Sequence, residues 1–483
     1  MLHRPLPVLK SVLAVSILMQ LAASGCRDLE NPPQKASPEI QRQDTSPSAD
    51  LRWLAKEDPS CQADGLSVAV SEITVYEWDG RQTAPKKVSF KGSAGPDREF
   101  VSQNITGSLI GFVSDYNCTI SATGAEICKV DKAKVQPEPT AFRMCRANAT
   151  YARESLESLT LTSQYYTESA YSFYEAIAGR KSGIIKSILV PQPIFMRHFT
   201  KADGTTSDRV DVNNASFASI PADGDQAKMG AFFIFPTSQK SFAASGVNLW
   251  EVPFVMRHEF GHHVLSHYLD KTLGATSLRL AKDVSLESIM PVSYRKHSSE
   301  AAFGLASGVT APQFALDGIN ETFADLFAYF AGNSAKAPLA GVRCLDVSRD
   351  PSSAVTARGS KKGLDSARVA IYEGRSAPLK SDGCSEPQFD DEHDIATALG
   401  QPMASFIEQA TPNLDASVRG EVLLAWASNL KILVATPSNV SLDTLVVELV
   451  KAVKQKNPNV TSACVHFKAA ITGLPKASAA CAN

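Results

Sequence analysis

"VMRHEFGHHVLSHY", residues 255–268, holds four of the nine histidines of this 483-residue chain, and a glutamate directly follows the first of them. Pro253 suits the first turn of a helix, and only Gly261 disfavours the helix that follows. On such a helix, His258 and His262 are four residues apart and share one face. The stretch is therefore either a metal site or a histidine-rich helix without a metal.

The spacing of these residues suits zinc chemistry. Two imidazoles placed four residues apart on a helix can converge on one zinc ion. Glu259 lies about 100° around the helix from His258, beside the metal position and not on it. Its carboxylate can take a proton from water that attacks a carbonyl and pass it to the leaving amine. Apolar residues on several sides of the helix predict burial, which favours a metal over unpartnered histidines.

A catalytic zinc site needs a third protein ligand. Tyr268 stands where one common pattern has a third histidine, so that pattern fails. In "NETFAD", residues 320–325, Glu321 and Asp325 are four apart and share one helical face. Such a face is often solvated surface, but Ala324 is small enough for a second helix to approach closely. Glu321 is therefore the candidate for the third ligand.

The two motifs together carry a resemblance to a known family. "HEFGHH" followed by "NETFAD" resembles the gluzincin metallopeptidases of the thermolysin-like clan, which carry H-E-x-x-H and then an N-E-x-x-A/S-D helix. The resemblance implies zinc bound by His258, His262 and Glu321, with Glu259 as general base, and implies that Asp325 holds a histidine ligand through its other ring nitrogen. It also implies a two-lobed α+β fold with a mixed-sheet lobe, an active-site helix and a mainly helical C-terminal lobe.

Weaker similarities lie outside the two motifs. Residues 163–177, "SQYYTESAYSFYEAI", are similar to the early aromatic helix of the family, and 213–217, "NNASF", to its edge strand. On that basis Asn214 and Ala215 bind the substrate backbone, with an ordinary loop or strand as the alternative. His393 is the candidate for the histidine that hydrogen-bonds the developing oxyanion, with a surface histidine as the alternative.

The chain also departs from the family pattern. His262 and Glu321 are farther apart than in the compact members, which predicts an insertion within 271–315 that forms a lid or rim of the cleft. Tyr294 and His297, inside this insertion, are weaker candidates for the transition-state groups. The transition-state tyrosine stays unassigned.

The composition and the N-terminal sequence indicate which partners and which cellular location to expect. With 48 basic and 50 acidic residues, the net charge of −2 gives no electrostatic reason to expect nucleic acid as a partner. Residues 1–25 combine basic residues, a short apolar run and small residues before Cys26. This segment resembles a bacterial lipoprotein signal, which implies a lipid anchor at Cys26, with conventional cleavage near Gly25 as the alternative. We therefore expect a cell-envelope protein facing the periplasm or on the outer membrane, or a secreted one if Cys26 is not lipidated.

The cysteine count supports export. If Cys26 carries lipid, eight cysteines remain, which can pair completely in an oxidising compartment. Proximity in the sequence suggests one of many possible sets of pairs, namely Cys118 with Cys128, Cys344 with Cys384, Cys464 with Cys481, and Cys61 with Cys145.

The remaining chain divides by composition. Residues 26–60 predict a disordered tether, 61–150 a small β-rich domain with disulfides, and 151–483 the metallopeptidase domain, with an upper lobe to 270 and a mainly helical lower lobe after it. In "DGINETFADLFAYFAG", Asp317 is the expected N-cap and Gly332 the expected stop. Further elements are expected as helices at 153–179, 393–410, 421–435 and 441–456, and as strands at 183–191, 213–220 and 229–236.

These observations support three hypotheses of function. The first is a monomeric zinc endopeptidase, tethered to a membrane, that cleaves peptides or proteins outside the cytoplasm. The second is an inactive binding or envelope lipoprotein on a peptidase-like fold. The third keeps the metal but acts on a cell-wall peptide or on one dedicated protein partner.

Overall fold

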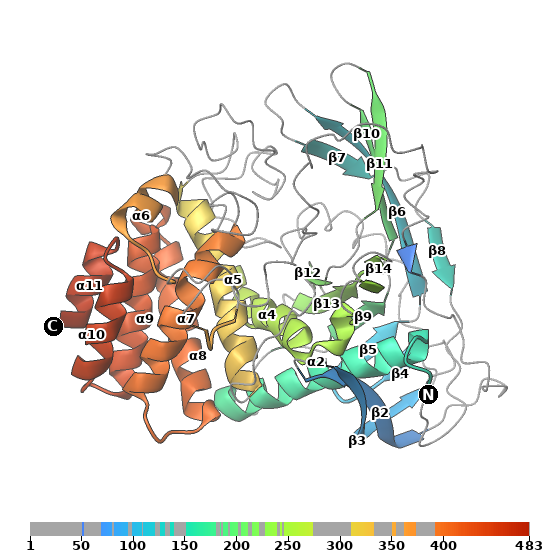
Figure 1. Ribbon diagram of the computed structural model, residues 1–483, viewed down its shortest axis with the longest axis horizontal. Helices are drawn as coiled ribbons and strands as arrows, with labels where there is room; N and C mark the ends of the chain where they lie inside the picture. Colours follow the sequence, from blue (N-terminus) through green and yellow to red (C-terminus); the bar gives the residue numbers. More distant parts are fainter. Residues whose placement is uncertain are drawn as a thin grey trace.

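A computed structural model gives the fold of this chain. It describes residues 51–52, 69–79, 82–94, 99–108, 110–120, 126–130, 136–139, 151–179, 184, 187–191, 194–200, 204–210, 215–221, 228–238, 242–243, 246–273, 311–332, 350–353, 362–372 and 392–482. The fold is a mixed α+β architecture, as expected, with the strands gathered on one side and the C-terminal helices on the other (Figure 1).

The larger sheet has seven strands, of which β12 and β13 contact the helix α4 (Pro253–Leu273). Neighbouring strands run antiparallel, except that β13 and β5, the two neighbours of β9, are parallel to it. The order is β12 (Ala215–Pro221), β13 (Lys228–Ile234), β9 (Ser187–Pro191), β5 (Ile105–Ser108), β4 (Glu99–Val101), β3 (Thr83–Ala94) and β2 (Ala69–Trp78).

A second sheet of five strands stands at the upper right of Figure 1. Its β6 and β10 are parallel, and the remaining pairs are antiparallel. It contains β11 (Thr206–Val210), β10 (Ile194–Thr200), β6 (Ile110–Ile120), β7 (Glu126–Val130) and β8 (Gln136–Pro139), and a separate two-stranded pair joins β1 (Leu51–Arg52) to β14 (Thr237–Ser238).

The other secondary-structure elements in the described residues are helices. In Figure 1, α4 and α5 lie between the sheets and the C-terminal helices, which are drawn in orange and red. The helices are α2 (Leu156–Ala178), η3 (Leu249–Glu251), α4 (Pro253–Leu273), α5 (Ala311–Ala331), α6 (Ser366–Tyr372), α7 (Glu392–Ala410), α8 (Ala416–Val434), η5 (Pro437–Asn439), α9 (Leu442–Lys456), α10 (Thr461–Ala470) and α11 (Pro475–Ala482).

Local sequence explains where the helices begin and end. The Ser155 side chain caps α2 by accepting a hydrogen bond from the Ser158 amide, and Gly179 follows the helix with a φ of 75°. Pro253 begins α4, where a missing amide hydrogen costs nothing. The end of α2 at Gly179 and the start of α4 at Pro253 agree with the sequence-based prediction, whereas α2 begins at Leu156 and not at the predicted residue 153.

The predicted start of α5 is wrong. We expected Asp317 to be its N-cap, but the helix begins at Ala311, so Asp317 lies within its second turn. Its carboxylate accepts a hydrogen bond from Gln313 Nε2 at 2.7 Å. The helix extends upstream because Phe314 and Leu316 continue its buried face. The predicted stop is correct, since α5 ends one residue before Gly332.

The sheets do not divide at residue 150, where we placed a domain boundary. The described part of 61–150 consists mainly of strands, as predicted. However, β5 pairs with β9 and β6 pairs with β10, so both sheets combine strands from the two sides of that boundary. One hydrophobic core likewise joins residues of β2 and β3 to those of the C-terminal helices.

The described residues bear on two further expectations. Cys464 and Cys481 form the predicted disulfide. Cys118 is disulfide-bonded, and Cys128 is its cross-strand neighbour between β6 and β7. Among the helices that the structure describes, none has the length and hydropathy that a bilayer crossing requires.

Candidate metal centre

Two antiparallel helices, α4 and α5, bring the predicted ligands together. They touch most closely at Gly261, where a Cβ atom would lie 2.7 Å from Ala324 Cα. Gly261 lies between the two candidate histidine ligands in α4, and Ala324 lies between the two candidate carboxylates in α5. The close contact is therefore centred on the predicted site, and only glycine allows it.

The three predicted ligands form one buried cluster. His258 Nε2 lies 3.0 Å from His262 Nε2 and 3.3 Å from Glu321 Oε2, and His262 Nε2 lies 3.5 Å from Glu321 Oε1. The exposed fractions of the three residues are 1%, 5% and 1%. Their ligand atoms all lie within 4.8 Å of one another, so the group could hold a metal ion.

The size of the cluster fits a tetrahedral centre. With bonds of about 2.0–2.1 Å, the ligand atoms of tetrahedral zinc lie about 3.3 Å apart. The shortest separations between the three side chains are 3.0, 3.3 and 3.5 Å, close to this value, although the last two end on different oxygens of Glu321. Two imidazoles and one carboxylate are also the donor set of a catalytic zinc site with three protein ligands and one open position.

Asp325 fixes the orientation of His258. Its Oδ1 lies 2.9 Å from His258 Nδ1, and its side chain is fully buried. Because an ionised carboxylate only accepts hydrogen bonds, this contact places the proton on Nδ1 and leaves Nε2 with a lone pair directed at the cluster. The Phe254 ring stacks on the same imidazole at a centroid distance of 6.2 Å. The sequence-based role of Asp325 as a partner of a histidine ligand has the expected geometry.

Glu259, the predicted general base, is fully buried in α4 next to His258. Its position one residue after a ligand directs its side chain about 100° around the helix from that ligand. It belongs to the same helix as the two imidazoles but is not part of the three-residue cluster.

The remaining histidines of the stretch are not in the cluster. His263 is buried on another side of α4, with its Nε2 3.4 Å from Ser187 Oγ. Burial, with a smaller contribution from His267, lowers the pKa of His263 to about 3. His263 is therefore a neutral core residue, and the prediction that His263 and His267 are not ligands agrees with this arrangement.

The structure describes only some of the other predicted site residues. Ala215 is fully buried at the start of β12, a strand that packs against α4 and lies at the edge of the seven-stranded sheet in the described residues. His393 is the second residue of α7. Its side chain lies outside the described part of the chain, as do Asn214, Cys26, and the insertion candidates Tyr294 and His297.

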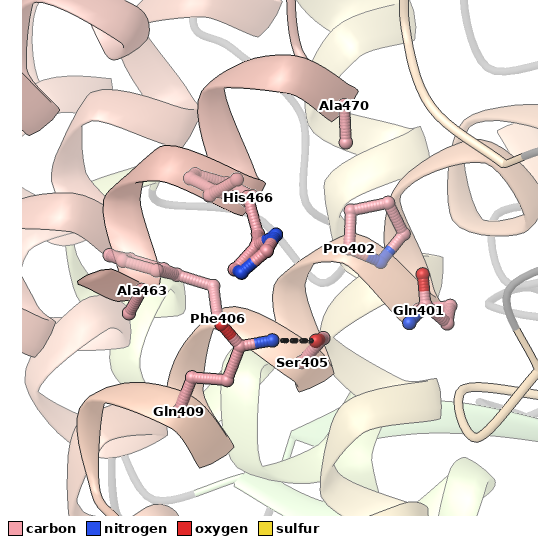
Figure 2. Close-up of a pocket in the computed structure, with 9 residues that line it drawn as sticks. Gln401, Pro402, Ser405, Phe406, Gln409, Ala463, His466 and Ala470 are labelled. Carbon is pink, nitrogen blue, oxygen red and sulfur yellow. Dashed lines mark hydrogen bonds between the residues drawn. The ribbon is translucent and has the colours of Figure 1, made fainter.

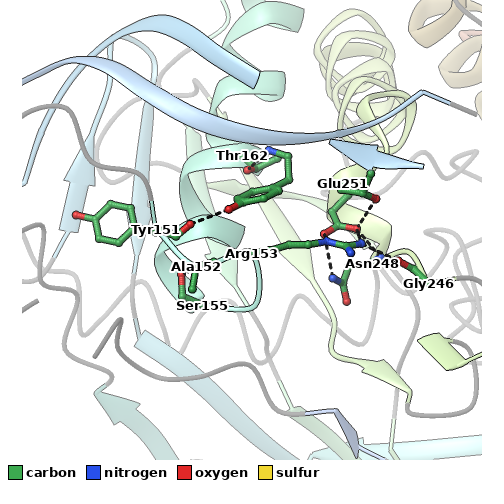
Figure 3. Close-up of polar contacts among 10 residues, drawn as sticks. Tyr151, Ala152, Arg153, Ser155, Thr162, Gly246, Asn248 and Glu251 are labelled. Carbon is green, nitrogen blue, oxygen red and sulfur yellow. Dashed lines mark hydrogen bonds and ion pairs between the residues drawn. The ribbon is translucent and has the colours of Figure 1, made fainter. Parts of the chain in front are cut away.

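A polar clamp that we did not predict holds the chain just before α4 (Figure 3). The buried Glu251 carboxylate accepts two hydrogen bonds from Arg153, each at 2.6 Å, and one from Thr83 Oγ1 at 3.0 Å. Asn248 donates its backbone N–H to Glu251 Oε2 at 2.9 Å. The spacing of Asn248 and Glu251 is that of a capping box, which was a usable sequence signal. Arg153 and Thr83 are too distant in the sequence to be recognised as partners.

A pocket of about 190 Å³ lies away from this centre, between α7 and α10 (Figure 2). Polar side chains of Gln401, Ser405, Gln409 and His466 line it, and Gln409 Nε2 donates to Ser405 Oγ at 2.8 Å. None of the predicted site residues borders this pocket, so it adds nothing to the metal chemistry.

No model of a known protein family matches the chain, and comparison with curated proteins finds none that is similar.

Proposed function

We propose that this protein is a zinc-dependent peptidase. The main support is the buried cluster of His258, His262 and Glu321, whose ligand atoms all lie within 4.8 Å of one another and which is the donor set of a catalytic zinc site. A zinc ion held there would act as a Lewis acid toward a substrate carbonyl and would lower the pKa of a water molecule. We also propose that the α+β fold is of the two-lobed thermolysin type, with α4 as the active-site helix.

In this proposal Glu259 moves the proton. It is a buried carboxylate one residue from a ligand, and it is not part of the three-residue cluster. It takes a proton from the attacking water and delivers it to the leaving amine, so that one residue serves both steps. Asp325 keeps the proton of His258 on Nδ1 and so keeps Nε2 available to the metal.

The strand β12 beside α4 supports a peptide as the proposed class of substrate. In the described residues β12 pairs only with β13, and it packs against α4. An extended peptide can add to the open edge of such a strand through backbone hydrogen bonds. We therefore propose that a peptide pairs with β12 near Asn214 and Ala215. Attachment to a membrane through Cys26, action outside the cytoplasm, and a role of His393 remain predictions from the sequence.

The substitution Glu259→Gln tests the proposed chemistry. The parent should hydrolyse an unstructured protein, and a chelator should abolish the reaction. The variant should keep its zinc and lose hydrolysis by about 10²–10⁴-fold, the usual contribution of a general base.

His267→Gln is the matched control, because His267 lies on the same helix outside the cluster. It should retain parental hydrolysis. A Glu259→Gln variant that cleaves as fast as the parent would show that Glu259 is not the base. A zinc-loaded parent that cleaves nothing would instead favour the inactive binding protein.

A further inference from the structure

His263 directly follows the ligand His262 but packs into the body of the protein. Its exposed fraction is 3%. Its ring is enclosed by aromatic rings from α2, β12, β13 and its own helix, with centroid distances of 4.9 to 6.4 Å, namely Tyr171, Phe217, Phe232 and Phe260. A polar ring in this apolar setting needs a specific hydrogen-bond partner.

That partner is the Ser187 hydroxyl, which lies with Tyr171 and Gly230 in a small buried space that we call the notch. Ser187 Oγ, at the start of β9, lies 3.4 Å from His263 Nε2. The same oxygen lies 2.5 Å from the hydroxyl of Tyr171 in α2. All three residues are buried, so moving the imidazole away from Ser187 would cost a buried polar nitrogen the hydrogen bond to its hydroxyl partner, which is unfavourable.

Gly230 makes room for the ring. A Cβ atom at Gly230 would lie 2.8 Å from Ser187 Oγ and 3.0 Å from His263 Nε2. A glycine inside a strand costs stability, and it often marks a place where another group approaches the backbone closely. In β13 the approaching group is the His263 imidazole.

The notch determines how α4 is turned about its own axis. His262 and His263 are consecutive, so their side chains are about 100° apart around the helix. A rotation that moved His263 out of the notch would turn His258 and His262 by the same angle, away from Glu321. Metal ligands generally must be held within about 10–20° of their productive geometry.

We infer that Ser187, Gly230 and Tyr171 act through His263 as positioning residues that aim the metal ligands of α4. This inference rests on the proposed zinc centre, because the geometry of that centre is what the notch would control. The four residues come from four elements, α2, β9, β13 and α4. They couple the seven-stranded sheet to the metal site without touching the metal.

The test compares two glycine substitutions that crowd different contacts. Gly230→Ala pushes against Ser187 and His263. Gly420→Ala, in α8, is the matched control, because its Cβ would lie 2.8 Å from side-chain atoms of Phe173 and Ile177 in α2, and not from α4. For each full-length protein, zinc affinity is measured by chelator competition and the visible absorption spectrum is recorded with Co²⁺ in place of zinc.

We expect Gly230→Ala to bind zinc about 10–100-fold more weakly and to shift the Co²⁺ spectrum, as changes around metal ligands usually do. Gly420→Ala should match the parent in both readouts even if its melting temperature falls. A folded Gly230→Ala protein with parental affinity and spectrum overturns the inference.

A milder variant guards against misfolding of Gly230→Ala. Ser187→Ala removes only the hydroxyl, so it should weaken zinc binding in the same direction by a smaller factor. Parental affinity and spectrum in this variant would also overturn the inference.

Metal binding by the parent protein distinguishes failure of the proposed function from failure of the positioning role. A parent that binds neither zinc nor Co²⁺ refutes the proposed function, whereas a metal-binding parent with unaffected notch variants refutes only the positioning role.

Discussion

At the scale of single residues, His258 is the proposed ligand whose orientation is most fully determined. Asp325 holds its Nδ1 at 2.9 Å, Phe254 stacks on its ring, and its Nε2 faces both other ligands. A hydrogen-bonded carboxylate behind a histidine ligand fixes the tautomer and raises the basicity of the ligating nitrogen. Asp325 should therefore contribute to zinc affinity without contacting the metal.

The substitution Asp325→Ala tests this contribution. It should weaken zinc binding by about 10–100-fold, because His258 loses the partner that orients its ring. Asp317→Ala is the matched control on the same helix, since Asp317 bonds to Gln313 and lies outside the cluster. Equal zinc affinities for these two variants, measured by chelator competition, would contradict the role given to Asp325.

Residue spacing predicts the proposed metal ligands but not the residues that hold them in position. His258, His262 and Glu321 belong to two short motifs whose helical spacing fixes where each side chain points. The notch around His263 has no such signature, because Ser187 and Gly230 lie on two strands whose approach to α4 depends on the whole fold. A glycine in a strand is visible in the sequence, but the group that approaches it is not.

At the scale of elements, the centre depends on the crossing of α4 and α5. The substitution Gly261→Ala would place a Cβ atom 2.7 Å from Ala324 Cα, a backbone atom that cannot move without its helix. The two helices must separate, which should cost about 1–3 kcal/mol of unfolding free energy. The separation also moves Glu321 away from the histidines, so zinc affinity should fall.

Gly400→Ala is the control for this substitution. Gly400 is also a helical glycine, but no atom lies within 4 Å of its added Cβ. Alanine there should leave zinc affinity unchanged and raise stability by up to about 1 kcal/mol through helix propensity. Urea unfolding and zinc titration of both variants provide the comparison. A Gly261→Ala protein with parental stability and affinity would show that the close crossing is not required.

Element boundaries were predictable where a local cap defines them. The end of α2 and the start of α4 depend on Gly179 and Pro253, which act within one helical turn. The predicted start of α5 was wrong. Aspartate is a common N-cap residue, which favoured Asp317, but tertiary packing buries Phe314 and Leu316 before it and extends the helix upstream. Packing of this kind depends on neighbours that the local sequence does not identify.

At the scale of the whole molecule, α4 contacts both the strands and the other helices. The Arg153 and Glu251 clamp ties the chain before α4 to β3 and to the start of α2. The helix then packs on the seven-stranded sheet on one side and on α5 and α8 on the other. We predicted a separate domain for 61–150, but β5 and β6 pair with later strands. Long-range strand pairing of this kind has no local signal in the sequence.

The zinc content of the purified protein tests the central claim most directly. It is measured by elemental mass spectrometry for the parent and for Glu321→Gln, with circular dichroism to show that both are folded. We predict one tightly bound zinc per chain in the parent and substoichiometric zinc in the variant, because only two protein ligands would remain. A folded parent that holds no stoichiometric zinc after incubation with the metal, or a variant that holds as much as the parent, would contradict the three-ligand centre.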